Sequence, residues 1–350
     1  MSDLKYLFAY TIPLATLLSV LSSGIYTFSA PIYAFIVIPL LELLLNDFDT
    51  SYSDAKKEKR VNNIFFDLLL YVNIPFVFGI LCYGFYILNK GLLLNYETIG
   101  IILSLGILLA TNAINVAHEL GHRTSKIDQT LSKLLLLPCL YMHFYLEHNF
   151  GHHKNVATPE DPATSKLNQS VYHFWVTSVF NQYLNAWQIQ SRLLKKENKG
   201  FLSFKNDMMW YTIFQTAYLG MWAITYGPIG LFFAVIVGIL SFVFLETINY
   251  IEHYGLVRKK LPSGRYERVQ THHSWNSNHI IGRIVLYELT RHSDHHFKAS
   301  KKYQILENKK ESPQLPFGYP TSILLSLVPP LWFWIMNSRI PDNKSIPISV

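Results

Sequence analysis

The chain has 350 residues, of which 50% are hydrophobic and only 15% are charged, and its mean hydropathy is +0.18. Soluble domains carry about 25% charged residues, so this composition excludes a disordered chain, argues against a soluble two-domain enzyme and indicates a membrane protein. The two cysteines, Cys82 and Cys139, both lie in apolar stretches, which excludes a disulfide framework and a thiolate metal cluster.

Six apolar stretches are long enough to cross a bilayer, since a membrane-spanning helix needs roughly 20 predominantly apolar residues. In chain order, the candidate helices are 6–26, 30–46, 64–88, 97–118, 208–226 and 229–251. The first two are expected to form a hairpin around Ser29–Pro31, and the second is short and contains Glu42. The sequence TYGPIG, with two glycines and a proline, predicts a tight turn between the last two.

Two apolar segments near the chain ends need separate interpretation. The N-terminal segment lacks a basic n-region and an A-x-A cleavage site, so residues 6–26 are expected to be a first helix and not a removable signal. Residues 319–336 are also apolar, but Pro329–Pro330 interrupts them. This interruption predicts a buried or interfacial segment that does not span the membrane.

The formal net charge of +7 is distributed unevenly along the chain. If the N-terminus is cytoplasmic, 29 of the 30 lysines and arginines fall on the cytoplasmic side, and Lys90 is the exception. This bias predicts cytoplasmic N- and C-termini and supports six spans, because an odd number of spans would remove the bias. The basic charge, which includes KKEKR at 56–60, is expected to face anionic lipid headgroups or an acidic soluble partner, not nucleic acid.

The predicted fold class is therefore all-α, with a single domain over residues 1–350. Its core is a six-helix transmembrane bundle. Residues 119–207 and 252–350 are expected to form a histidine-rich cytoplasmic cap on that bundle.

The chain has 14 histidines, and nine of them form short groups at the predicted cytoplasmic end of the bundle. These nine are His118, His122, His148, His152, His153, His253, His292, His295 and His296. His118 and His122, within HELGH, are four residues apart and can share one helix face, and so can His148 and His152. The last group has a spacing of three, which also lets helical side chains converge.

Nine grouped imidazoles are difficult to explain as ordinary polar residues. Imidazole titrates near pH 6.5, so a partly buried cluster would be destabilised by desolvation or mutual repulsion if its members were charged. A bound metal ion removes both penalties because it takes the neutral imidazole as a ligand. One ion seldom has more than about six ligands, so nine histidines predict two ions. The lack of cysteine ligands disfavours structural zinc and iron–sulfur clusters, and leaves Fe, Zn, Cu and Ni open.

Metal-bound histidines usually donate their second N–H to a carboxylate or carbonyl group. Seven residues beside the histidine groups are candidates for this orienting role: Glu119, Glu147, Glu160, Asp161, Asn249, Glu252 and Asp294. For Glu160 and Asp161, helix capping or surface charge is a nearly equal alternative.

Five histidines lie outside these groups. His143 and His173 are expected to be ordinary polar or packing residues. His272, His273 and His279 flank the sequence SWNSN and could line the site, although ordinary packing is favoured.

The histidine groups and their surroundings resemble those of a known family. HELGHR, EHNFGHHKNVATPEDPA, NYIEHYG and LTRHSDHH resemble the four histidine boxes of the integral-membrane alkane 1-monooxygenases, and HSWNSN is similar to a further pattern of that family. The resemblance covers about residues 112–297, and the family is related to the membrane fatty-acid desaturases. Arg123, Thr290 and Phe297 stand where the family usually has Lys, Gln and Ala, and none of these departures removes a ligand.

The resemblance implies that the nine histidines bind two irons in a non-haem di-iron centre. It implies O2-dependent hydroxylation of the terminal carbon of medium- or long-chain n-alkanes to 1-alkanols, in a bacterial inner membrane. Electrons would come from NAD(P)H through rubredoxin reductase and rubredoxin. The residues agree on one point: the chain has no CxxC pair and no convincing GxGxxG site, so any reductant must arrive from separate proteins.

Three other functions remain possible at the level of sequence. A related membrane enzyme could desaturate or hydroxylate another lipid or an aryl methyl group. An intramembrane zinc protease could use HELGH with Glu119 as general base, but it would leave seven histidines without a role. A metal transporter or histidine-rich sensor ranks last, because a transporter would place polar ligands near the membrane midplane.

Overall fold

The computed structural model describes residues 3–45 and 52–341. Within these residues the chain is helical, and extended pairing is confined to two isolated bridges, Lys260 with Tyr266 and Asn276 with Gln314. The predicted all-α class is therefore confirmed for the described part of the chain. The last residue of the predicted helix 30–46 and residues 342–350 of the predicted cap lie outside the described residues.

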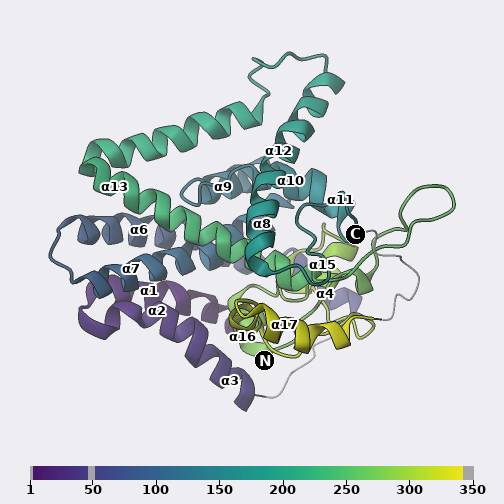
Figure 1. Ribbon diagram of the computed structural model, residues 1–350, viewed down its shortest axis with the longest axis horizontal. Helices are drawn as coiled ribbons and strands as arrows, with labels where there is room; N and C mark the ends of the chain where they lie inside the picture. The colour runs from purple at the N-terminus through teal and green to yellow at the C-terminus, as the bar shows by residue number, and fades with distance from the viewer. Residues whose placement is uncertain (1–2, 46–51, 342–350) are drawn as a thin grey trace.

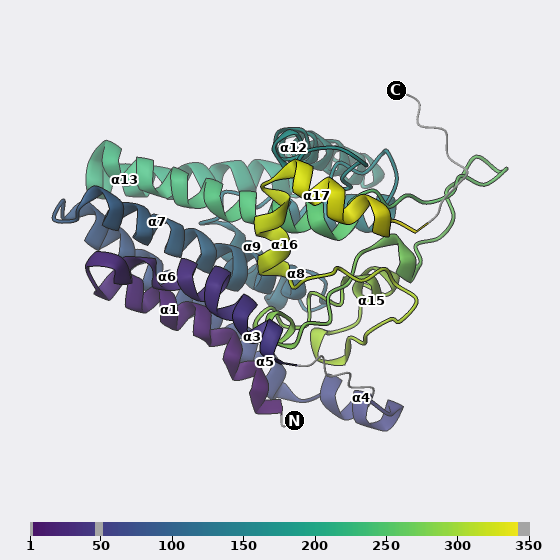
Figure 2. The same ribbon diagram turned by 60° about the horizontal axis from the view of Figure 1, so that its bottom comes forward.

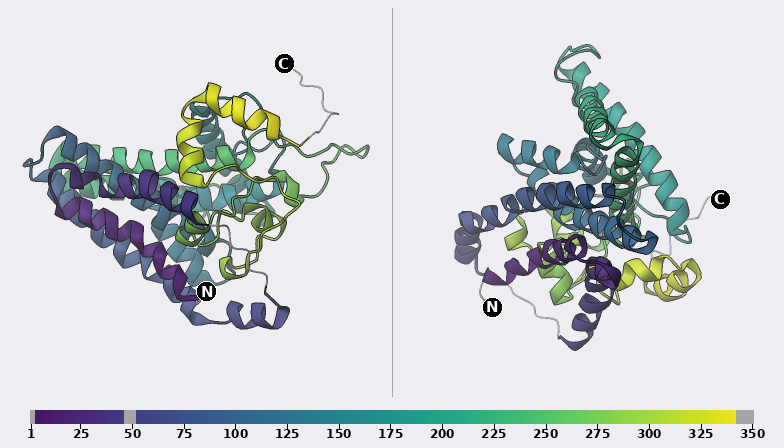
Figure 3. Two further views of the ribbon diagram at one scale, coloured as in Figure 1. Left: turned by 90° about the horizontal axis from the view of Figure 1, so that it is seen from below. Right: turned by 90° about the vertical axis from the view of Figure 1, so that its left-hand side faces the viewer.

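Long helices gather at one end of the molecule, and short helices and loops gather at the other (Figures 1 and 2). The long elements include α6 (Asn73–Asn89), α7 (Asn95–Leu108) and α13 (Asp207–His253). The N-terminal helix α1 (Thr11–Leu21) packs against α6 and α7, and Figure 3 shows these helices extending together away from the compact end. The short α15 (His292–Phe297) lies at that compact end.

Five helical stretches are long and apolar enough to cross a membrane. They are Asp3–Leu21, Gly24–Leu44, Ile64–Asn89, Asn95–Gly121 and Asp207–His253. The last, α13, has 47 residues and contains both predicted helices 208–226 and 229–251. Its helical geometry breaks at Gly227, which has φ +68°, and Figure 1 shows two arms that meet at a sharp bend. The bend lies within TYGPIG, and the count of six separate spanning helices stays a prediction.

The predicted hairpin around Ser29–Pro31 is wrong, because the chain turns earlier. Helix α1 ends at Leu21, and Gly24 takes φ +64°, a left-handed conformation that glycine adopts without strain. The carboxylate of Glu97 accepts the Gly24 backbone N–H and so fixes this turn to the start of α7. Pro31 lies instead in the short helix α2 (Ser29–Ile32), where the first turn of a helix tolerates a missing N–H.

The apolar segment 319–336 forms two short helices, α16 (Tyr319–Ser326) and α17 (Pro329–Met336). The proline pair begins α17, as expected where a proline cannot continue the preceding helix. Trp332 and Met336 are buried, and α16 packs against α13. The segment is therefore packed on the bundle, and neither helix has the length to span a bilayer.

The bend in α13 generates a prediction about Gly230. A Cβ atom at this position would lie 2.6 Å from the backbone carbonyl oxygen of Trp222 on the other arm, so Gly230→Ala should force the arms apart and destabilise the fold by about 1–3 kcal/mol. The measurement is the thermal unfolding temperature in detergent. Gly220→Ala, where no heavy atom lies within 4 Å of the added Cβ, is the matched control, and equal melting temperatures for the two variants would contradict the packing described.

Candidate metal centre

The structure brings all nine grouped histidines together, in two sets. The five-histidine group consists of His118, His122, His148, His153 and His295. The four-histidine group consists of His152, His253, His292 and His296. Within each group, one ring nitrogen of every member lies within 4.8 Å of those of all the others. Each group therefore has the size of the ligand set of a single metal ion.

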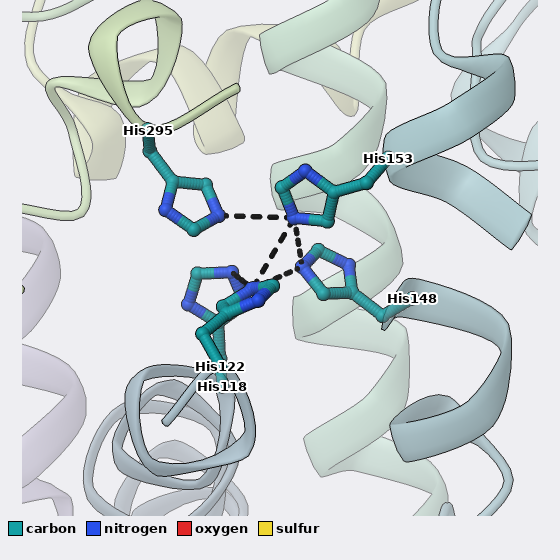
Figure 4. A group of neighbouring side chains, drawn as sticks. All are labelled: His118, His122, His148, His153 and His295. Carbon is teal, nitrogen blue, oxygen red and sulfur yellow. Dashed lines mark hydrogen bonds between the residues drawn. The ribbon is translucent and has the colours of Figure 1, made fainter. Parts of the chain in front are cut away.

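The ring nitrogens of each group point at one another, as Figure 4 shows for the five-histidine group. Its neighbouring Nε2 atoms lie 3.0–3.3 Å apart, and those of the four-histidine group lie 2.9–3.2 Å apart. A neutral imidazole carries only one ring proton, so these nitrogens cannot all donate hydrogen bonds to one another. Converging lone pairs are satisfied by a cation, and the donor set fits a pair of imidazole-bound metal ions.

The ends of two membrane-spanning stretches supply three of the nine rings. His118 lies in α8 (Asn115–Gly121), which ends the fourth stretch, and His122 follows it directly. The two fall in the same group, as their spacing of four residues indicates. His253 is the last residue of α13. Packing of the long helices therefore sets the positions of these three side chains.

The second sequence group is divided between the two sets by a local change of helix type. His148 and His152 were expected on one face, but they fall in different groups. Residues His148–His152 form a π-helical turn, η5, in which the His153 N–H bonds to the His148 carbonyl. Because this wider turn closes over five residues, it places His153 with His148 and directs His152 to the other group.

The histidines of helix α15 are also divided between the two groups. His292 and His296 are four residues apart and both belong to the four-histidine group. His295 belongs to the five-histidine group. The expected convergence of His292 with His295 at spacing three is therefore wrong, because the spacing of four selects the partner on this helix.

Burial keeps these rings uncharged. It lowers the pKa of His122 to about 3, and repulsion from His152 acts in the same direction. Burial followed by repulsion between neighbouring imidazoles holds the pKa well below its ordinary value in five further rings: His148, His153, His292, His295 and His296. At neutral pH these side chains therefore present lone pairs, which is the form in which imidazole binds metals.

Asp161 orients one ring of the four-histidine group. Its carboxylate lies 2.9 Å from Nδ1 of His152, and both side chains are buried. Burial lowers the pKa of His152, but Asp161, together with the charges of Glu147 and Glu252, raises this pKa above its ordinary value. With a proton held on Nδ1, the Nε2 lone pair faces His296 at 3.2 Å. This is the carboxylate–histidine arrangement found behind metal ligands.

Glu252 contacts the inner ring nitrogen of His292, whereas an orienting carboxylate would contact the outer one. One carboxylate oxygen is 3.2 Å from Nε2 of His292, which is the nitrogen that faces the rest of the group. The second oxygen accepts a hydrogen bond from the Tyr319 hydroxyl at 2.6 Å. Glu252 therefore adds an oxygen donor beside the four converging nitrogens.

The other five candidates for orienting residues contact different partners. Glu147 bonds to Asn185, Glu119 to Arg123, Asn249 to Glu246, Glu160 to Tyr266, and Asp294 to Lys301. Among the described residues, none of the five has a hydrogen bond to a histidine of either group. Their role as histidine orienters stays a prediction.

Residues 273–278, HSWNSN, brace the site in a way that histidine spacing did not reveal. The Trp275 backbone N–H donates to the Glu252 carbonyl at 2.8 Å, and its indole Nε1–H donates to the Tyr254 carbonyl at 2.9 Å. The side-chain oxygen of Asn276 accepts the Ser293 N–H at 2.8 Å. This segment therefore ties the end of α13 to α15. The HSWNSN motif was the sequence feature that could have indicated this bracing role, although it contains no metal-binding residue after its first histidine.

The remaining histidines stand apart from the two groups. His143 is buried beside the ring of Tyr141, and His173 is exposed. His272 and His273 form a separate cluster with Glu267. Nδ1 of His273 accepts the Gln270 N–H, so Nε2 carries the ring proton and is directed at Glu267, 3.3 Å away. Hydrogen bonding thus occupies both nitrogens of His273, and this cluster does not fit a metal.

An apolar cavity of about 60 Å³ lies between the long helices and the compact end. Its walls come from elements distant in the chain and include Ile12, Ile38, Ala110, Phe244, Val285 and Tyr319. The accessible walls are entirely apolar. Tyr319 is shared between the cavity and the metal centre, because its hydroxyl bonds to Glu252. Two side chains, Tyr319 and Glu252, therefore connect the cavity to His292 of the four-histidine group.

The chain is similar to fatty acid desaturases and to several monooxygenases. Residues 94–323 match the family of fatty acid desaturases. The chain is 37% identical to alkane 1-monooxygenase 2 of Alcanivorax borkumensis, over 88% of this chain and 81% of that protein. It is 34% identical to alkane 1-monooxygenase 2 of Pseudomonas aeruginosa, over 87% and 81%. It is also 28% identical to the hydroxylase component of xylene/toluene monooxygenase from Pseudomonas putida, over 79% and 74%.

The contact between Asp161 and His152 generates a prediction about metal affinity. Asp161→Asn removes the charge that holds the ring proton on Nδ1, so the affinity for metal should fall by about 10–100-fold. The measurement is the number of ions that the purified protein retains during dialysis against a graded chelator. Glu160→Gln is the matched control. Glu160 precedes Asp161 in the chain, and its carboxylate contacts Tyr266 and no histidine. Equal retention by both variants would exclude the orienting role of Asp161.

Proposed function

The chain belongs to the alkane 1-monooxygenase family, and on this premise we propose that it hydroxylates the terminal carbon of medium- or long-chain n-alkanes. One atom of O2 enters the 1-alkanol and the other leaves as water, with two electrons and two protons consumed. The observation that carries the proposal is the pair of converging imidazole groups. An unactivated C–H bond needs a strong oxidant, which a redox-active metal with O2 supplies when bound.

The nine histidines would hold two iron ions, one in each group. Zinc has no redox chemistry, so it fits the donor set but not the reaction. Asp161 fixes the proton of His152 on the outer nitrogen. Tyr319 holds the Glu252 carboxylate beside the four-histidine group. These residues orient the ligands before a substrate arrives, so little rearrangement is required during turnover.

The apolar cavity would receive the end of the alkane. A saturated hydrocarbon offers no polar group to bind, so its position must come from the shape of an apolar wall. Ile12, Ile38 and Phe244 lie on membrane-spanning stretches, and an alkane dissolved in the bilayer could enter between them. Exclusion of water by these walls would also protect the oxidant from side reactions.

Electrons would come from rubredoxin, which NAD(P)H reduces through rubredoxin reductase. The compact end would face the cytoplasm of a bacterial inner membrane, with both termini on that side, because almost all the basic residues then lie inside. This orientation places the metal centre within reach of soluble partners and keeps the cavity within reach of the bilayer.

Hydroxylation of an aryl methyl group is the second candidate. It is favoured by the 28% identity with the hydroxylase component of xylene/toluene monooxygenase. The alkane reaction is preferred because the relatives named for it are 34–37% identical. A zinc protease is disfavoured by the site, since Glu119 is paired with Arg123 at 3.3 Å and is not available as a general base.

Metal analysis together with a product assay tests the proposal. Purified protein should contain two irons per chain and should convert octane or hexadecane to the 1-alkanol when reduced rubredoxin is supplied. His148→Ala or His295→Ala removes one ligand from the five-histidine group, so it should reduce iron content and abolish turnover while the protein still inserts. His173→Ala is the control, because this histidine is exposed. Full activity in either ligand variant would refute the assignment, and one zinc without iron would refute the function.

Substitution in the cavity should change chain-length preference. Ala110→Phe would fill space at the cavity wall, so oxidation of hexadecane should fall more than oxidation of octane, because a longer chain needs more of the occupied volume. The measurement is the ratio of the two kcat/KM values. Ala217→Phe, at an exposed position on α13, should leave this ratio unchanged. An unchanged ratio in Ala110→Phe would show that the substrate lies elsewhere.

A further inference from the structure

Residues 257–270 form a hairpin that projects from the compact end of the molecule. An isolated antiparallel bridge joins Lys260 to Tyr266, and the Leu261 N–H donates to the Arg265 carbonyl at 2.8 Å. Figures 1 and 3 show the hairpin as a green loop that extends away from the long helices. It therefore points away from the part of the chain that lies in the bilayer.

The exposed charges of this hairpin have one sign. Lys259, Lys260, Arg265 and Arg268 are all exposed, and none of them forms an ion pair with another described residue. The acidic residue of the hairpin, Glu267, is half-buried, and its carboxylate accepts the Lys259 backbone N–H at 2.8 Å. The fully exposed charges of the hairpin are therefore all positive, and the neighbouring exposed carboxylate, Glu160, contacts Tyr266 on it.

The base of the hairpin is attached to the metal centre. The Arg258 backbone N–H donates to the Ala157 carbonyl at 2.7 Å, and its guanidinium donates to the Lys154 carbonyl at 2.8 Å. Lys154 directly follows His153, which belongs to the five-histidine group. His152, one residue earlier, belongs to the four-histidine group. The hairpin is thus hydrogen-bonded to a short helical segment that carries one histidine of each group.

We infer that the hairpin is the docking surface for an acidic one-electron carrier protein, and that electrons enter the centre through the segment His152–Lys154. The inference rests on the proposed function, which consumes two electrons per turnover. Two reduced carriers would dock in succession and each would be oxidised by one electron, while water supplies the two protons. A positively charged hairpin raises the encounter rate with a negatively charged partner. Because the hairpin is attached beside both histidine groups, the path of an electron from the docked carrier to each group is short.

A soluble partner fits the surface better than anionic lipid. A headgroup-binding segment lies close to the membrane plane, where surface potential decays within about 10 Å at 0.1 M salt. The hairpin extends in the opposite direction from the membrane-spanning helices (Figure 3). A protein that approaches from the aqueous side would meet this arm first.

The test is charge reversal of the four exposed residues, Lys259→Glu, Lys260→Glu, Arg265→Glu and Arg268→Glu, in the full-length iron-loaded protein. Anaerobic stopped-flow mixing with reduced rubredoxin measures the second-order rate of its oxidation without requiring an alkane. The variant should react about tenfold more slowly or worse at low salt, and it should lose most of the salt dependence that the unaltered protein shows. Reduction by dithionite should be the same in both proteins.

Two controls separate docking from other effects. Lys195→Glu with Lys196→Glu reverses exposed charges at the end of α12 (Val171–Lys196), so it should leave the rubredoxin rate almost unchanged. An unaltered rate in the hairpin variant, or an equal loss in this control, would overturn the inference. If the unaltered protein oxidises rubredoxin rapidly but produces no 1-alkanol, the proposed function fails while the docking surface stands.

Discussion

The approach of nine imidazoles to one another, seven of them buried, is the constraint on which the rest of the structure depends. Neighbouring Nε2 atoms lie 2.9–3.3 Å apart in both groups, and protons alone cannot satisfy so many inward lone pairs. Cations can, and they bind only when all the ligand-bearing segments are in place. Metal binding is therefore coupled to the assembly of the fold, because the unfolded chain has no comparable site.

The two groups are not equivalent, and the difference lies in what surrounds the rings. The five-histidine group is composed of nitrogen donors alone. The four-histidine group has Asp161 behind His152 and Glu252 beside His292. Negative charge close to an ion stabilises its higher oxidation state, so two ions bound here would differ in electronic character. The π-helical turn makes this division possible, because it separates adjacent histidines into different sets.

Much of the site could be predicted from sequence, since spacing identified every histidine of the two groups and apolar length located the membrane-spanning stretches. Partition of the rings could not be predicted, because His148 and His152 are divided by a π-turn that leaves no mark on residue spacing. The first hairpin was predicted at the wrong place because Pro31 is a strong turn signal, whereas the turn at Gly24 is bonded to Glu97, a residue far along the chain. The division of the histidines and the position of the first turn therefore depend on tertiary contacts, which local sequence preferences do not reveal.

The proposed separation between the path of the alkane and the path of the electrons follows from the chemistry of the two reactants. An alkane partitions into lipid and an electron carrier stays in water, so one centre can use both only at the boundary between them. In this fold Tyr319 and Glu252 connect the apolar cavity to the four-histidine group, while the basic hairpin is bonded to Lys154, which follows one histidine of each group. Under the proposed function, the alkane and the electron carrier would therefore contact different residues around the centre. Under the proposed function, a centre deeper in the bundle would be out of reach of the carrier, and one farther out would expose the oxidant to water.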